Sequence, residues 1–409
     1  MTPPPWLGEA PGRLDFLGGV ADYSGSLVLQ TPIRATTRVA ITPTAQPRLR
    51  VASDQEGVVE LPSPDPDELV PPSGEVAPLV AWLDAHDAPR WARYPLGCLF
   101  LFGRAMGWRP EGGLSIEIKT DVPTSMGVSS SAALEVATLR ALEAGSGRRF
   151  EGTALARLAQ LAENEVVGAP CGLMDQLAAA HGVPGSLLPI LCRPDVLREP
   201  VPLPEGAIVA GWPSGVRHAV SGPEYATART AAFMGKRMLE VALGRRIDHL
   251  AELPPSVVGG VTADDLPGWI TGAEFLARFG WLEDPRSDVD PDRRYPARAG
   301  TEFAVGENHR GDLAERLLRA WGADRAGTLR VVGELMYQSH LGYGSIGLGS
   351  PETDAMVEAV RGMGPGRGFY GARASGGGCG GTVVVLLEAA SLVELRRLAE
   401  RAGTPALIL

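Results

Sequence analysis

Residues 123–137 read PTSMGVSSSAALEVA, a glycine- and serine-rich loop that runs directly into a strong helix pattern. The N–H groups and the dipole at the start of such a helix favour an anion, and serine hydroxyls can reach a phosphate or its Mg²⁺. In the alternative interpretation, residues 129–131 only cap the helix. The string GxxxxGK[ST] does not occur in the chain, so a Walker-type nucleotide loop is excluded.

The segments around this loop mix strands and helices without a regular βαβ alternation, which favours the α+β class. Alternating apolar residues predict a strand at 113–120, a second strand is predicted at 26–41, and a proline-rich surface loop at 62–72. Helices are predicted at 91–106, 132–144, 153–167, 225–243, 308–320 and 329–340. The 409 residues suffice for two domains, which we expect at 1–202 and 203–409.

Composition excludes several classes of function. The formal net charge of −10 argues against nucleic acid or an anionic membrane as a partner, because both bind basic surfaces. No apolar run is long enough to cross a membrane, and no signal peptide is recognised, so we expect a cytoplasmic protein. The four cysteines form no CxxC pair, which argues against a zinc site. Lysine occurs only at Lys119 and Lys236, so a mechanism that uses a buried lysine has few candidates.

Two further stretches offer acid–base chemistry. In GAPCGLMDQ, residues 168–176, the carboxylate of Asp175 follows a Pro/Gly turn and could accept a hydroxyl proton. The alternative is an exposed aspartate favoured by the start of a helix. In APGRLDFLGGVADY, residues 10–23, Arg13 and Asp22 flank a turn. Arg13 is either a permanent charge that lowers the pKa of a carboxylate or part of a surface ion pair of little energetic value.

The glycine-rich stretch GARASGGGCGGTVVVLL, residues 371–387, fits GxGxxG at Gly376, Gly378 and Gly381. It precedes a predicted strand instead of following one, which contradicts a dinucleotide fingerprint. Its glycines would let the backbone approach a ligand or another loop, or would only form the entry to a hairpin.

Together these stretches resemble the GHMP kinase family, whose motifs are an N-terminal APGR segment, a PxxxGLSSSAA phosphate loop and a C-terminal glycine-rich loop. The galactokinase branch is the most similar, because PCGLMDQ, GVRHAVSGPEY (215–225) and LMYQSH (335–340) also match. The resemblance implies an N-terminal domain like domain 2 of ribosomal protein S5 and a ferredoxin-like C-terminal domain. It also implies ATP as phosphoryl donor, with Mg²⁺, and a small sugar as acceptor. Neither the oligomeric state nor the role of residues 253–296 follows from the resemblance.

The resemblance assigns roles residue by residue. Asp175 would take the proton from the anomeric hydroxyl of a sugar, and Arg13 would keep Asp175 ionised and stabilise charge on the reacting oxygens. Mg²⁺ would be held by Ser131 and Glu163, with Glu165 as second choice. The phosphates and adenine of ATP would contact Gly127, Val128, Ser129, Ser130, Ser131, Trp91 and Tyr94. The sugar would contact Asp22, Gly19, Val20, Gly172 and Tyr225.

One departure from the galactokinase pattern bears on the substrate. Galactokinases read Gly-Glu-His-x-Asp-Tyr in the first turn, where the Glu and His hold the C6 end of galactose. This chain reads Gly18-Gly19-Val20-Ala21-Asp22-Tyr23. Because L-arabinopyranose has the ring stereochemistry of D-galactopyranose without C6, we expect L-arabinose as substrate and L-arabinose 1-phosphate as product. The stretch GGVADYSGSLVLQ also resembles the kinase domain of plant L-arabinokinases.

The alternatives are a galactokinase or a sugar 1-kinase of broad specificity, in which Gly19 and Val20 only open space. A non-catalytic sugar sensor is a further alternative. Sensors related to galactokinases lose a Ser-Ala pair that is intact here at residues 130–133. A kinase of a non-sugar alcohol such as mevalonate is disfavoured by PCGLMDQ and by VRHAVSGPEY.

Overall fold

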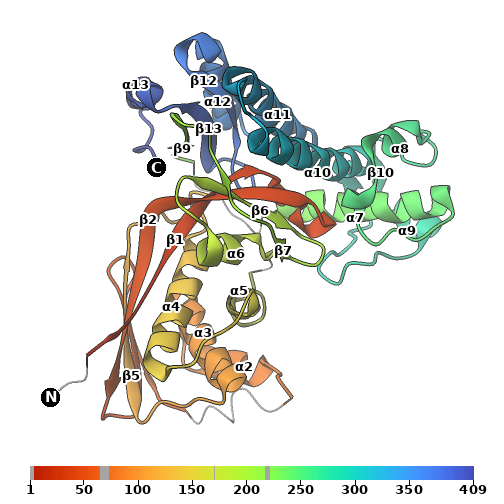
Figure 1. Ribbon diagram of the computed structural model, residues 1–409. Helices are drawn as coiled ribbons and strands as arrows, with labels where there is room; N and C mark the ends of the chain where they lie inside the picture. Colours follow the sequence, from red (N-terminus) through yellow and green to blue (C-terminus); the bar gives the residue numbers. More distant parts are fainter. Residues whose placement is uncertain (1–3, 65–72, 170, 217–221) are drawn as a thin grey trace. The chain divides into compact units, whose positions relative to one another are not determined.

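The structure is a computed structural model that describes residues 4–64, 73–169, 171–216 and 222–409. Most of the predicted loop at 62–72, Pro170 of PCGLMDQ and residues 217–221 of GVRHAVSGPEY therefore lie outside the described residues. The described residues form two compact units (Figure 1). The first unit takes its residues from 1–13, 33–124 and 129–181, and the second from 14–32, 125–128 and 182–409. The predicted boundary at residue 202 stays a prediction.

The first unit contains an antiparallel and parallel sheet in the order β4–β3–β5–β2. These strands are β2 (Leu27–Thr44), β3 (Arg48–Ser53), β4 (Gly57–Pro62) and β5 (Gly113–Thr120). Within this unit, residues 37–44 of β2 pair with β5. Strand β1 (Trp6–Leu17) also pairs with β2. In β5, Leu114, Ile116 and Ile118 are buried whereas Glu117 and Lys119 are exposed. The alternation that predicted this strand therefore corresponds to one buried face.

Helices of the first unit pack on one face of this sheet (Figure 1). They are α2 (Ala77–Ala85), α3 (Arg90–Met106), α4 (Ser130–Ser146), α5 (Ala154–Leu161), the π-helical turn η2 (Ala162–Val167) and α6 (Met174–His181). Ile41, Val51 and Ile116 from the strands and Phe102 and Val136 from the helices share one apolar core. The helices predicted at 91–106 and 132–144 are confirmed, and α4 begins in the serine loop as its pattern indicated.

The second unit contains a three-stranded antiparallel sheet in the order β12–β13–β9. Its strands are β9 (Ala207–Pro213), β12 (Phe369–Ala374) and β13 (Thr382–Glu388), and they pack with α11 (Arg325–Ser345), α12 (Pro351–Met363) and α13 (Leu392–Ala402) (Figure 1). The central strand β13 is buried from Thr382 to Leu387. Residues 27–30 of β2 pair with β6 (Ser186–Leu191), which also pairs with β7 (Val196–Leu197) and β8 (Val201–Pro202). The mixture of sheets and covering helices agrees with the predicted α+β class.

A helical layer of the second unit is built on α7 (Pro223–Leu243) and α10 (Ala297–Arg319). The prediction began α10 only at residue 308, because Gly300, Thr301 and Gly306 weaken the helix pattern. These small residues allow close packing: a Cβ at Gly300 would lie 3.0 Å from the backbone N of Ala232. Tertiary packing thus outweighs the low local helix propensity.

Residues 253–296, to which the family resemblance assigned no role, form α8 (Pro255–Gly260), β10 (Ile270–Thr271), α9 (Gly272–Phe279) and β11 (Arg294–Tyr295). Val258, Phe275 and Tyr295 of this segment share an apolar core with Met238 of α7 and Ala304 of α10. The segment is thus an integral part of the second unit. None of the helices in the described ranges combines the length and the apolar character needed to cross a bilayer.

Candidate active site

Arg13 and Asp175 form an ion pair within the first unit. Arg13 stands at the end of the unit's first segment, in β1, and Asp175 lies in the first turn of α6. The guanidinium Nε donates to Oδ1 of Asp175 at 2.8 Å and Nη2 donates to Oδ2 at 2.9 Å. The Arg13 side chain is 4% exposed and that of Asp175 is 21% exposed. This is an oriented, two-point pair with one partly accessible carboxylate, unlike an exposed surface ion pair.

Ser129, the residue before α4, also binds the carboxylate of Asp175. Its hydroxyl donates to Oδ2 of Asp175 at 2.5 Å, and it makes no capping bond to the helix. Ser129 has φ 57°, in the left-handed region that costs a non-glycine residue about 1 kcal/mol or more. The hydroxyl of Ser129 is therefore held at Asp175 and is not a helix cap.

Ser131 and Glu163 lie together on α4 and η2. The Ser131 hydroxyl bonds the Glu163 carboxylate, and the amide of Gln176 donates to Oε2 of Glu163 at 2.6 Å. Burial raises the pKa of Glu163 to about 7, although these hydrogen bonds oppose the shift. The same Gln176 amide donates to Glu135 at 3.1 Å.

Glu135 is fully buried on α4, and its Oε1 has no hydrogen-bond partner. Burial, and then the charge of Glu163, raise the pKa of Glu135 well above its ordinary value. Among the residues that the structure describes, neither Glu135 nor Glu163 makes an ion pair. The first unit thus gathers carboxylates that lack a cation from the chain, beside two serine hydroxyls.

A pocket of about 160 Å³ in the first unit brings together residues from both ATP motifs. Trp91 and Tyr94 of α3 line it together with Ser130 and Ser131 at the start of α4, and Leu134 lies on the same wall. An aromatic pair beside a helix N-terminus suits a planar base attached to phosphates. Gly172, predicted to contact sugar, is half-buried two residues before α6 of the same unit.

The remaining part of the predicted phosphate loop, Gly127 and Val128, belongs to the second unit. Gly127 has φ +71°, and Val128 is buried. The hydroxyl of Thr382 on β13 donates to the carbonyl of Met126 at 2.7 Å, which fixes this part of the loop to the sheet of the second unit.

The predicted sugar turn, residues 18–23, also lies in the second unit and forms the 3₁₀ helix η1 (Gly19–Ser24). Gly19, Val20 and Asp22 are buried, with Asp22 at 7% exposed. One carboxylate oxygen of Asp22 accepts from the N–H of Tyr23 at 2.8 Å. The ring of Tyr225 meets that of Tyr23 edge-on at 6.3 Å, so Tyr225 lies beside the residue that follows Asp22.

Residues 253–296 contribute to the support of this turn. Asp284 accepts two hydrogen bonds from Arg229 of α7, at 2.8 and 2.9 Å, and the Arg229 guanidinium lies 5.2 Å from the centre of the Tyr23 ring. The segment therefore orients a cation against the residue that follows Asp22.

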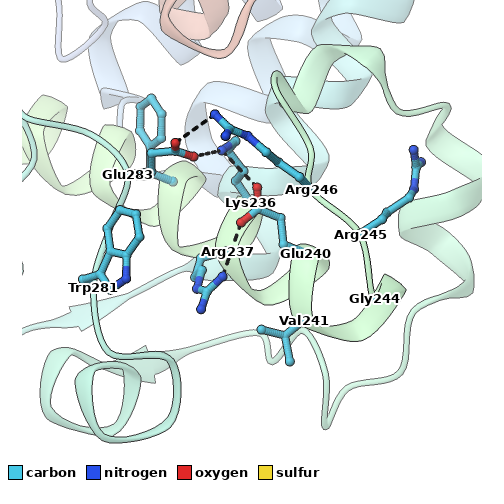
Figure 2. A pocket seen from close by; sticks show the side chains of 10 residues that line it. Lys236, Arg237, Glu240, Val241, Gly244, Arg245, Arg246, Trp281 and Glu283 are labelled. Atoms are coloured by element: carbon cyan, nitrogen blue, oxygen red, sulfur yellow. Dashed lines mark hydrogen bonds and ion pairs between the residues drawn. The ribbon is translucent and has the colours of Figure 1, made fainter.

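A larger pocket of about 420 Å³ in the second unit has a different character (Figure 2). Figure 2 shows Lys236 between Glu240 and Glu283, with distances of 3.1 and 2.9 Å to their carboxylate oxygens. Arg246 also pairs with Glu283. Lys236 is 6% exposed. The charge of this buried lysine is compensated by the two glutamates. It has a structural role and is no candidate for phosphate binding.

Comparison with known proteins identifies the family. The model of the GHMP kinases N terminal domain matches residues 93–183, and that of the GHMP kinases C terminal domain matches residues 314–402. Galactokinase of Chloroflexus aggregans is 33% identical, over 96% of this chain and 86% of its own length. L-arabinokinase of Arabidopsis thaliana is 32% identical over 93% of this chain, which spans 42% of that longer protein.

The chain belongs to the GHMP kinase family. It is an enzyme, a sugar kinase of the galactokinase and arabinokinase type, and membership of the family implies use of ATP. Among solved structures, Lactococcus lactis galactokinase complexed with galactose has a TM-score of 0.76 at 20% identity, covering 98% of this chain and 92% of its own. A mevalonate kinase has a TM-score of 0.62 at 14% identity, covering 98% and 97%. These similarities confirm the two-domain GHMP kinase fold.

Sequence reasoning missed two residues that the structure places in the first-unit cluster, Glu135 and Gln176. Both were inside quoted motifs, SSSAALEVA and PCGLMDQ, yet neither was given a role. Glu135 is the fourth residue of the helix predicted at 132–144, inside the otherwise apolar stretch AALEVA. It was the available signal, because a charged residue on a buried face needs a reason.

Proposed function

We propose that this GHMP kinase transfers the γ-phosphoryl group of ATP to the anomeric hydroxyl of L-arabinose, giving L-arabinose 1-phosphate and ADP. The observation that carries the proposal is the turn at residues 18–23. It keeps Asp22, a partner for ring hydroxyls, and has no side chain at Gly19 and an apolar, buried one at Val20. A site without hydrogen-bond partners for a C6 hydroxyl gains no binding free energy from a sugar that has this group. The relatives include an L-arabinokinase, which supports the same substrate.

The Mg²⁺ that such a transfer uses fits the residues at Ser131 and Glu163. Both offer oxygen atoms, which Mg²⁺ prefers, and the two side chains are already hydrogen-bonded to each other. Ser131 and Glu163 would hold the ion, which would offset negative charge on the phosphates during transfer. The unpaired carboxylates around it suit a cation that comes from outside the chain.

In the proposed mechanism, Asp175 accepts the proton of the anomeric hydroxyl as that oxygen attacks the γ-phosphorus. Arg13 holds the carboxylate in a fixed orientation through two hydrogen bonds, and Ser129 fixes its second oxygen. The base therefore loses little freedom when it reacts. Backbone N–H groups at residues 127–131 donate hydrogen bonds to phosphate oxygens, and Trp91 and Tyr94 flank the adenine. The bond from the γ-phosphorus to the bridging oxygen breaks, and ADP leaves with that electron pair.

A galactokinase is the second candidate, because Chloroflexus galactokinases match over most of their own length. The absence of a side chain at Gly19 does not by itself exclude a larger sugar. A sensor without activity is disfavoured, since the Arg13–Asp175 pair is in place. Small molecules are the proposed partners and the cytoplasm the proposed location.

The test is to compare kcat/KM for L-arabinose, D-galactose and 6-deoxy-D-galactose with ATP and Mg²⁺. We expect L-arabinose to exceed D-galactose by about tenfold or more, which is about 1.4 kcal/mol of transition-state discrimination. 6-Deoxy-D-galactose separates the loss of the hydroxyl from the loss of C6. If D-galactose exceeds both other sugars, the proposal is wrong and the chain is a galactokinase. Absence of turnover with all three would favour the sensor.

A further inference from the structure

Position 19 has no room for a side chain in this fold. Gly19 has φ +52°, and a Cβ added there would lie 2.2 Å from the hydroxyl oxygen of Tyr343. It would also lie 2.8 Å from Nη2 of Arg373. Contacts below 3.0 Å do not occur for real Cβ atoms, so one of the neighbours would have to move. All three residues belong to the second unit.

Tyr343 cannot move easily, because several contacts fix it. It is fully buried on α11, its ring meets Phe303 edge-on at 5.5 Å, and the Arg373 guanidinium lies 5.0 Å from the ring centre. Arg373 is itself held by the carboxylate of Asp15 at 2.9 Å. The obstacle at position 19 is thus part of a packed core and not the free end of a flexible side chain.

The hydroxyl of Tyr343 also joins two loops of the second unit. It accepts from the N–H of Val20 at 3.2 Å and donates to the carbonyl of Gly376 at 2.5 Å. Gly376 begins the glycine-rich loop, in which a Cβ at Gly378 would lie 2.4 Å from the carbonyl of Leu348. The glycines of this loop therefore permit close approach to residues 343–348, and Tyr343 connects the loop to the turn that carries Asp22.

We propose that Tyr343 is a specificity-determining residue of this kinase. It is a positioning residue: its hydroxyl takes the place of a side chain at position 19 and holds the turn at residues 18–22 in a form that presents Asp22 alone. Gly19 is then required by Tyr343 and is not a chance loss. The proposal deepens the proposed function and rests on it for the identity of the sugar.

The first experiment compares Tyr343→Phe with Tyr337→Phe. Tyr337 lies on the same helix and is also buried, but it packs against Arg361 and the core of the β12–β13–β9 sheet. Loss of the Tyr343 hydroxyl should raise the KM for sugar about tenfold with little change in kcat or in the KM for ATP. The kcat/KM ratio of L-arabinose to D-galactose should change about threefold or more. Tyr337→Phe should change none of these values.

Equal sugar KM values for the two variants would overturn the proposal. If the unaltered enzyme prefers D-galactose, the proposed substrate is wrong, but Tyr343 is still judged by the difference between the two variants. The two failures are therefore distinguishable.

A second experiment needs no sugar. Gly19→Ala and Tyr343→Leu are made alone and together, and the urea midpoint of unfolding is measured for each. Gly19→Ala should lower the midpoint strongly in the unaltered chain and less than half as much in the Tyr343→Leu background, where the nearest obstructing atom, the Tyr343 hydroxyl oxygen, is gone. Part of the loss remains in both, because alanine is strained at this φ. Additive midpoint shifts would contradict the proposal.

Discussion

Two fully buried glutamates, one in each unit, have opposite surroundings. Glu135 of the first unit has Gln176 as its hydrogen-bond partner. Burial raises the pKa of Glu135, and the nearby carboxylates of Glu163 and Asp175 raise that pKa further. Glu307 of the second unit accepts from the N–H of Gly18 at 2.9 Å and the hydroxyl of Ser339 at 2.6 Å. Burial is the largest single influence on Glu307 and would raise its pKa too. The charges of Arg310 and Arg373 and the two hydrogen bonds together outweigh it and lower the pKa.

The difference separates a site from a scaffold. Buried carboxylates that are paired with arginines of the same chain stabilise the fold. Glu307 accepts a hydrogen bond from the backbone N–H of Gly18, and Asp15 forms an ion pair with Arg373. Buried carboxylates without such a partner are costly to the fold and suit a cation that binds later. Changes in the first cluster should therefore affect catalysis, and changes in the second should affect stability.

The largest effect should follow from Asp175→Asn, which removes the base and leaves the shape. We expect kcat to fall by about 10³- to 10⁴-fold, or about 4 to 5.5 kcal/mol, since proton acceptance and charge are both lost. The midpoint of thermal unfolding should stay within a few degrees, because the carboxylate is partly exposed. Steady-state kinetics with L-arabinose and calorimetry would measure both values. A kcat within tenfold of the unaltered enzyme would contradict the role of base.

The second effect concerns stability. Arg373→Met should lower the free energy of unfolding by about 3 to 5 kcal/mol, because the buried carboxylate of Asp15 loses the guanidinium that compensates its charge. Asp15→Asn combined with Arg373→Met should restore part of that loss. Urea unfolding would measure the difference between the single and the double variant. If the single variant loses less than about 1 kcal/mol, the pair is not the scaffold described here.

The smallest effect concerns the free energy of unfolding, which Glu135→Gln and Glu307→Gln should change in opposite directions. The raised pKa of Glu135 means that its contribution is most favourable below the unfolded pKa and is lost as pH rises through the folded pKa. The lowered pKa of Glu307 means that its contribution is present above the unfolded pKa and is lost as pH falls through the folded pKa.

At neutral pH, Glu135→Gln should therefore stabilise the chain and Glu307→Gln should destabilise it. Each substitution should remove a slope of up to about 1.4 kcal/mol per pH unit, in opposite directions. Unfolding midpoints recorded from pH 4 to pH 8, without nucleotide, would measure the slopes. Shifts of the same sign in both variants would remove the distinction between the two clusters.

The sequence predicted best where pattern and local structure coincide. Strand β5 and helix α3 were predicted within one residue of their bounds, because alternation and helical periodicity reflect one buried face each. The start of α10 was missed because glycines that look like helix breakers are required by close packing on α7. Local propensity carries no information on a neighbouring helix.

The same limit applied to the candidate site. The resemblance to the GHMP kinases assigned roles to Arg13, Asp175, Ser129, Ser131 and Glu163. The structure brings these five together in the first unit. Glu135, Arg373 and Tyr343 were not singled out, because their partners are distant in the sequence. The partner of Ser129 was also unforeseen, because its left-handed backbone conformation is rare for serine and is invisible in the pattern.

The short distance between position 19 and Tyr343 also imposes an order on change over generations. A lineage that acquired a side chain at position 19 first would produce a less stable chain, because the added atoms would collide with Tyr343. Replacement of Tyr343 by a smaller residue would have to come first, while Gly19 still tolerates either neighbour. If Tyr343 has the proposed role, a change in sugar preference at this turn is favoured by one order of substitutions and opposed by the reverse order.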